Sequence, residues 1–180
     1  MAVTRAQLMA HWGARRIIYF PAEERLLKYI QVGPEAFPPD GAMPTEVPIL
    51  YTVAVTAPDL DLFSVLSLEL GEDRPTLLIV IGSVPSNADM LYCLDPATGA
   101  VMLLDLDEDN PGYEQVNSSF ATFVEFLYRL DELIQSDPGG TDRALWAASL
   151  RGELLQIDAT AFDDPESWWN AAFAQLLTSA

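Results

Sequence analysis

The middle of the chain contains short apolar runs of strand length, each bounded by proline, aspartate or glycine. These runs occupy residues 49–55, 62–70, 76–82, 90–94 and 100–106. The last two runs flank the sequence DPATG, in which Pro96 presets a turn dihedral and Gly99 supplies a positive φ. The pattern predicts five strands, and it predicts that residues 95–99 close an antiparallel hairpin between the last two.

Helical spacing follows the strands. Between residues 119 and 135, apolar side chains recur every three or four positions and form one stripe, which consists of Phe120, Phe123, Val124, Leu127, Leu130 and Ile134. Ser118 and Ser119 supply capping oxygens directly before this stripe. We therefore expect one helix over residues 119–135, packed on the sheet, with Phe123 and Leu127 largely buried.

The last part of the chain repeats the helical pattern twice. One helix is expected over residues 142–157 and another over residues 164–178. The second begins with Asp164 as its cap and Pro165 at the first helical position, where proline loses no hydrogen bond. Trp169 belongs to the apolar face of this helix.

The first part of the chain is mixed. A short helix over residues 4–13, a strand over 16–20 and a helix over 22–33 are expected, and the proline density of residues 33–48 predicts an ordered loop. Strands therefore gather in the middle and helices at both ends. This order is typical of the α+β class and differs from an alternating βαβ order.

Length and composition favour one folded domain that spans residues 1–180. Half of the residues are apolar, which is enough for a substantial core. No apolar run is long enough to cross a bilayer, and the first residues lack the apolar core of a secretory signal, so a cytoplasmic protein is expected. The single cysteine, Cys93, lies in an expected strand and is interpreted as a buried apolar residue.

Charge is the most unusual bulk property of the chain. The formal net charge is −18, from nine basic and 27 acidic residues. The first thirty residues hold five of the bases and only two of the acids, so the rest of the chain, with four bases and 25 acids, carries −21. Such a surface repels nucleic acid and anionic lipid and attracts basic partners. Solubility alone explains the same charge equally well.

The sequence offers little for catalysis. A hydrolytic triad needs a histidine, and the only one is His11, with no G-x-S-x-G sequence to accompany it. One cysteine and one histidine do not complete a zinc site, and no nucleotide-binding glycine motif is present. We therefore expect no catalytic residues, no metal and no enzyme activity.

Four acids occur within five residues at the end of the last expected strand, namely Asp105, Asp107, Glu108 and Asp109. The aspartates match the first ligand positions of a calcium loop of the EF-hand type. The match then fails, because Asn110 stands where glycine is needed and Val116 where a bidentate glutamate is needed. Paired carboxylates also serve glycosidases, but no other feature indicates a sugar cleft. The remaining interpretation is that these acids form a charged surface that binds another protein.

Two tryptophans in tandem give a second contact candidate. Trp168 and Trp169 cannot both face the core from one helix, and Trp169 fits the apolar stripe. Trp168 is therefore expected to be partly exposed, and exposed tryptophan often anchors interfaces.

The order of these features resembles a known family. The segment LLIVIGSVPSNADMLYCLDPATGAVMLLDLDEDN, the helix start VNSSFATFVEFL and the sequence LRGELLQIDATAFDDPESWW are similar to the SUKH superfamily. Within it, they resemble the fourth group of immunity proteins from bacterial polymorphic toxin systems.

The resemblance implies an α+β fold with a central, mainly antiparallel sheet flanked by helices, and it implies neither catalytic residues nor a cofactor. It also implies a partner toxin domain, often one that acts on nucleic acid, whose basic cleft would suit an acidic surface. Regulators and scaffolds of the same fold are the alternative. We expect the partner to contact Asp105, Asp107, Glu108, Asp109, Glu114 and Trp168. We expect the protein to bind neither nucleic acid nor membrane directly.

Overall fold

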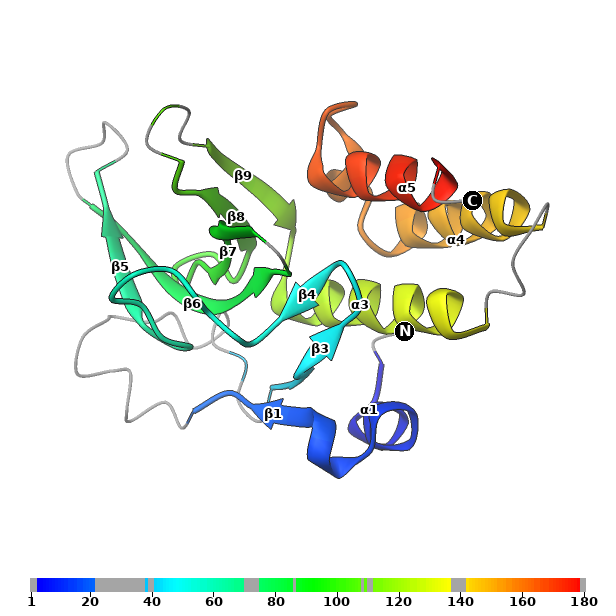
Figure 1. The fold of residues 1–180 in the computed structure, drawn as a ribbon, viewed down its shortest axis with the longest axis horizontal. Helices are drawn as coiled ribbons and strands as arrows, with labels where there is room; N and C mark the ends of the chain where they lie inside the picture. Colours follow the sequence, from blue (N-terminus) through cyan, green and yellow to red (C-terminus); the bar gives the residue numbers. More distant parts are fainter. Residues whose placement is uncertain are drawn as a thin grey trace.

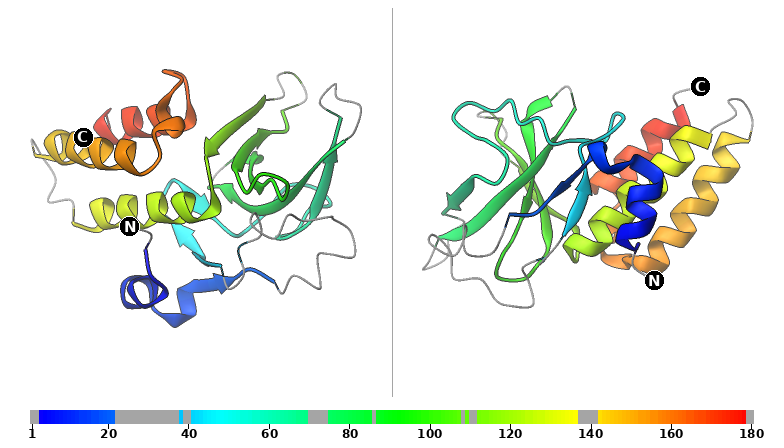
Figure 2. Two further views of the ribbon diagram at one scale, coloured as in Figure 1. Left: turned by 180° about the vertical axis from the view of Figure 1, so that it is seen from behind. Right: turned by 90° about the horizontal axis from the view of Figure 1, so that it is seen from below.

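A computed structural model describes residues 3–21, 38, 41–69, 75–85, 87–107, 109, 112–136 and 142–178. The fold divides into a strongly curved sheet and a group of helices beside it (Figure 1). Both views in Figure 2 keep the helical group on one side of the sheet. The α+β class expected from the order of elements is confirmed.

All strand pairs in the described residues are antiparallel. The main sheet has the strand order β3 (Glu46–Val47), β4 (Tyr51–Thr52), β6 (Thr76–Val84), β7 (Asn87–Leu94), β8 (Val101–Asp105) and β9 (Gly112–Asn117). A further strand, β5 (Val65–Leu68), also pairs with β6. β1 (Ile17–Tyr19) and β2 (Ala42–Pro44) form a separate pair.

The predicted hairpin is present between β7 and β8. Leu94 pairs with Val101 at its closed end. Asp95 shapes the turn, because its carboxylate accepts hydrogen bonds from the Ala97 N–H and the Thr98 hydroxyl, each at 2.8 Å. Gly99 has the positive φ that the turn requires, 80°.

Helix α3 (Phe120–Ser136) carries the predicted apolar stripe into the core. Phe123 and Leu127 are fully buried. The ring of Phe123 lies 5.0 Å from that of Tyr92 on the sheet and 6.5 Å from that of Trp169 on α5 (Trp168–Thr178), measured between centroids. This helix therefore joins the sheet to the other helices.

The sheet buries apolar side chains on both faces. Val101 and Leu103 of β8 pack in the larger cluster with α3, whereas Met102 and Leu104 pack in a smaller cluster on the other face. The free thiol of Cys93 belongs to the smaller cluster and is buried, as expected.

The remaining helices are α1 (Arg5–Trp12) and α4 (Arg143–Ile157), close to the expected bounds. Thr4 caps α1 through a reciprocal pair of bonds with Gln7. The helix expected over residues 22–33 lies outside the described residues. Within the described chain, no helix is both long and apolar enough to span a bilayer.

The start expected for α5 is wrong. The helix begins at Trp168, and the four residues before it form turns. The Asp164 carboxylate accepts a hydrogen bond from the Glu166 N–H at 2.8 Å, and the Asp164 carbonyl accepts one from the Ser167 N–H at 3.0 Å. Asp164 therefore organises a local turn and does not cap a helix.

Three strand and loop boundaries also differ from the prediction. The loop expected over residues 33–48 is wrong in its second part, where β2 and β3 form and where Met43 and Val47 are fully buried. The strands expected over 49–55 and 62–70 are shorter, because Ile49 (φ 63°) and Phe63 (φ 67°) leave extended geometry.

Candidate partner-binding surface

The acidic turn (residues 105–109) follows β8 and is shaped by its own carboxylates. Asp105 ends the strand and pairs with Met90 on one side and Gly112 on the other. Its carboxylate accepts a hydrogen bond from the Asp107 N–H at 3.0 Å, and the Asp107 carboxylate accepts one from the Asp109 N–H at 2.9 Å. Two successive side-chain bonds of this kind fix the backbone of the turn.

Asp107 and Asp109 are exposed, and Asp105 is half-buried. Glu108 lies outside the described residues. The sequence holds no lysine or arginine between residues 75 and 128. Of the described residues, only His11 with Asp131 and Arg129 with Glu125 come within ion-pair distance, and neither pair involves the turn. The negative charge of the turn is therefore not offset by a described basic side chain.

Two large side chains beside the turn were not predicted as contact residues. Leu106 is 36% exposed and Tyr113 is 40% exposed. The Leu106 N–H donates to the Asp89 carbonyl at 2.9 Å, which continues the pairing of β7 and β8 beyond the end of β8. Tyr113 lies opposite Leu104. The alternation of side chains along a strand places Leu104 and Leu106 on one face, so Tyr113 and Leu106 share it.

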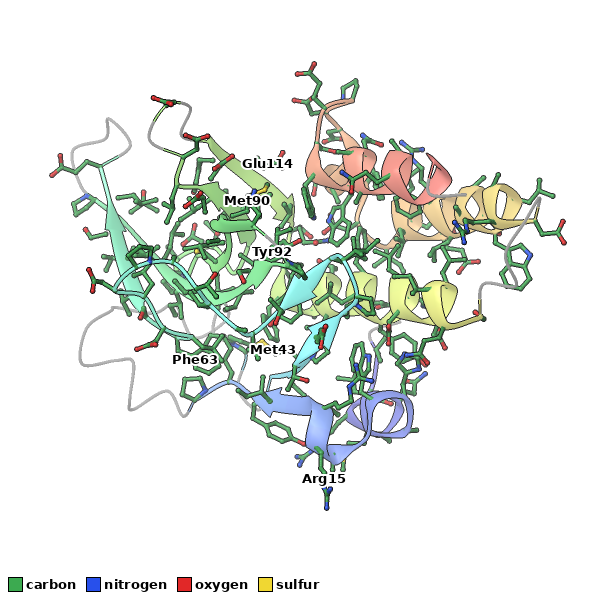
Figure 3. All side chains as sticks on the ribbon, viewed as in Figure 1. Arg15, Met43, Phe63, Met90, Tyr92 and Glu114 are labelled. Atoms are coloured by element: carbon green, nitrogen blue, oxygen red, sulfur yellow. The ribbon has the colours of Figure 1, made fainter. Side chains whose placement is uncertain are left out.

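Glu114 and Trp168 form a separate contact on the helix-facing side of the sheet. Glu114 lies opposite Leu103, which packs in the larger cluster. Its carboxylate accepts a hydrogen bond at 3.1 Å from the N–H of Trp168, the first residue of α5. The ring of Trp168 lies 6.3 Å from that of Tyr92, in an edge-to-face arrangement. Figure 3 shows Glu114, Tyr92 and Met90 on this part of the sheet.

The electrostatics of Glu114 fit a junction between β9 and α5. Partial burial raises its pKa, the nearby charge of Asp164 raises it further, and the hydrogen bond from the Trp168 N–H opposes both effects. The pKa remains above its usual value. A carboxylate at the first N–H of a helix also interacts favourably with the helix dipole. Glu114 therefore supplies the helix cap that sequence reasoning assigned to Asp164.

The five predicted contact residues that the structure describes divide into two groups. Asp105, Asp107 and Asp109 share the acidic turn, whereas Glu114 and the half-buried Trp168 hold β9 against α5. Trp169 is fully buried, as its place in the apolar stripe predicts, and its indole N–H donates to the carbonyl of Val116 at 3.0 Å.

The only histidine takes part in packing between α1 and α3. One oxygen of the fully buried Asp131 lies 2.8 Å from His11 Nε2 and accepts hydrogen bonds from the Trp12 indole at 2.6 Å and the Gln135 amide at 2.7 Å. Within the described residues, no group of three or more acidic, histidine or cysteine side chains is placed to hold a metal ion.

The comparisons with known proteins identify a family for this chain. Searches of curated proteins and of solved structures return no match. The model of the SUKH-4 immunity protein family matches residues 3–175, which include the sheet, α3 and the acidic turn. This match covers nearly the whole chain of 180 residues. The chain belongs to the SUKH-4 immunity protein family.

Proposed function

We propose that this protein is a cytoplasmic immunity protein that neutralises a toxin domain by binding it through the acidic turn. The chain acts as a single domain of residues 1–180 and contributes no catalysis of its own. Membership of an immunity protein family supports the general role. The acidic turn supports the particular surface.

One observation carries this proposal. Asp107 and Asp109 are exposed on a turn that their own backbone bonds hold in place, and no described basic side chain pairs with them. The carboxylates of Asp107 and Asp109 are close in sequence and repel one another, although the Asp107 side chain also holds the backbone of the turn. A positively charged partner would relieve that repulsion.

The favoured partner is a toxin domain that acts on nucleic acid. Such a domain must present a basic cleft to phosphate groups, and the same cleft attracts carboxylates. Charge complementarity of this kind raises association rates by about tenfold to a thousandfold. The net charge of −18 makes direct binding of the protein to nucleic acid unfavourable.

Leu106 and Tyr113 give the proposed surface an apolar centre beside the acids. Exposed aromatic residues often contribute much of the affinity of an interface, whereas charges at its edge chiefly set the association rate. In this proposal the acids of the turn guide the toxin domain, and Tyr113 and Leu106 slow its release. Glu114 and Trp168 support the surface from behind, because they hold β9 in place.

The test begins by identifying a toxin gene that neighbours this one, and the toxin domain it encodes is the partner in the binding assay. The triple substitution Asp107→Asn, Glu108→Gln, Asp109→Asn should lower the association rate at low salt, and the difference from the natural protein should shrink as salt is raised. A matched control neutralises three acids on α3 and α4 by Glu132→Gln, Asp142→Asn and Glu153→Gln, and it should have a smaller effect. Equal rates for the natural protein and the turn variant at low salt would place the docking surface elsewhere.

A further inference from the structure

The α3–α4 groove is a second surface feature, formed where these two helices pack. It has a volume of about 260 Å³. Leu133 of α3 and Leu150 and Trp146 of α4 supply its apolar lining, and Glu132 and Glu153 supply carboxylates from the two helices. The groove thus combines apolar side chains from both helices with acidic side chains from both.

Helix α4 exposes more apolar surface than the fold requires. Its inward stripe consists of Ala147, Leu150 and Leu154, which are buried. Leu145 and Trp146 lie off this stripe and are 70% and 43% exposed. Of these two residues Trp146 lines the groove, and tryptophan is prominent among residues that anchor interfaces.

The charges around the groove favour a positively charged occupant. Arg129 also lines the groove, but its guanidinium lies 3.7 Å from the carboxylate of the buried Glu125, so part of its positive charge is offset by that carboxylate. Arg151 is directed away from the groove: it donates to the Asn170 side chain of α5 at 2.8 Å and lies over the ring of Phe162, which precedes α5. The carboxylates of Glu132 and Glu153 therefore leave the groove negative.

We propose that the α3–α4 groove binds a basic amphipathic helix of a partner protein. Its apolar side chains would contact Trp146, Leu133 and Leu150, and its lysines or arginines would face Glu132 and Glu153. A second copy of this chain fits less well, because each copy carries a net charge of −18. β8, which ends at the acidic turn, lies on the left of Figure 1 and α4 lies on the right, so this site would remain open with a toxin domain bound at the turn.

The test uses a defined probe and does not depend on the toxin. The probe is a fluorescent peptide helix with leucines at i, i+3, i+4 and i+7 and lysines elsewhere, and its counterpart has glutamates in place of the lysines. Binding to the natural protein is followed by fluorescence anisotropy, and amide shifts in isotope-labelled protein locate the site. The lysine peptide should shift the amides around the groove, and the glutamate peptide should not bind.

Two pairs of variants separate the groove from general attraction to an acidic protein. Trp146→Gln should weaken binding by about tenfold or more, whereas Leu106→Gln, which removes an exposed apolar side chain at the acidic turn, should not. The double variant Glu132→Gln, Glu153→Gln should weaken binding by about threefold to tenfold at low salt. Asp107→Asn with Asp109→Asn removes the same formal charge far from the groove and should have less effect.

Several results would overturn the proposal. These are amide shifts confined to other surfaces, equal weakening by the groove and turn variants, and unchanged affinity after Trp146→Gln. Sedimentation that shows a dimer dissociated by Trp146→Gln would assign the groove to a second copy instead. The toxin experiment reads a different surface, so either proposal can fail without the other.

Discussion

The carboxylates of the core and those of the acidic turn have opposite surroundings. Asp158 is buried, and one of its oxygens accepts bonds from the Asn117 amide, the Ser118 N–H and hydroxyl and the Thr122 hydroxyl at 2.7–3.1 Å. Asp107 and Asp109 are exposed. The Asp107 carboxylate accepts a hydrogen bond from the Asp109 N–H, and no bond to the Asp109 carboxylate is present within the described residues. Neutral donors thus satisfy the core carboxylate, whereas the turn leaves its charges to the solvent.

The contrast between Asp158 and the turn acids shows that some acids are satisfied by neutral donors even though basic residues are scarce. Such acids are not available to bind a partner. Only nine lysines and arginines serve 27 acids, and the buried Asp131 and Asp158 are stabilised chiefly by hydroxyl, amide and indole groups. Burial alone raises the pKa of Asp158, but the bonds from Ser118, Thr160, Asn117 and Thr122 hold it below its usual value. An acid with such partners is a structural part of the fold, and an acid without them is free to meet another protein.

The largest expected effect is a loss of stability when a core side chain is truncated. Phe123→Ala removes a fully buried ring between the sheet and α5, and it should lower the free energy of unfolding by about 3–5 kcal/mol. Urea denaturation measures this loss. A loss below about half a kcal/mol would contradict the packing of α3 described above.

Asp158→Ala tests how much the buried carboxylate contributes to stability. It leaves several buried donors without an acceptor and should cost about 2–3 kcal/mol in urea denaturation. Asp158→Asn keeps one acceptor oxygen and should cost less. If the alanine variant matches the natural protein in stability, the carboxylate does not hold the segment before α3 to the chain after α4.

The pH dependence of stability separates Asp158 from Glu114. The pKa of Asp158 is lowered on folding, so its contribution is present above its ordinary value of 3.8 and is lost as the pH falls below it. The pKa of Glu114 is raised on folding, so the native state loses relative stability as the pH rises through and above 4.5. Asp158→Asn should therefore flatten the acid side of the stability profile, and Glu114→Gln should flatten the profile above pH 4.5. Thermal unfolding over a pH series checks both signs, and the opposite assignment of the two slopes would refute them.

The smallest effect belongs to the acidic turn. Asp107→Asn with Asp109→Asn should leave the free energy of unfolding unchanged within about half a kcal/mol, or raise it slightly, because it removes repulsion at exposed positions. Asparagine retains an oxygen that can accept the backbone hydrogen bond of Asp107. A loss of more than about 1 kcal/mol in urea denaturation would show that the turn carboxylates serve folding.

Local signals made the hairpin and α3 predictable. The turn after β7 depends on Asp95, Pro96 and Gly99, which lie within five residues, and α3 depends on a stripe repeated within one segment. Both the type and the approximate bounds of these elements could therefore be read from short windows of sequence.

Contacts distant in sequence explain what could not be predicted. The cap of α5 comes from Glu114, 54 residues before Trp168, so the nearby Asp164 and Pro165 gave a false start for the helix. The strand β2 depends on its pairing with β1, which the proline count of its own segment does not reveal. The contact surface was predicted from five acids and Trp168, and Tyr113 could have been added only from the register of β8 and β9.

Amide shift mapping of the complex tests the central claim most directly. Isotope-labelled protein is compared with and without the toxin domain that the gene-neighbour test identifies. We predict that the largest changes fall at the acidic turn and at Tyr113, with smaller changes at the Trp168 junction and little change on α4. Changes centred on α4 or on α1, with the acidic turn unaffected, would contradict the proposed docking surface.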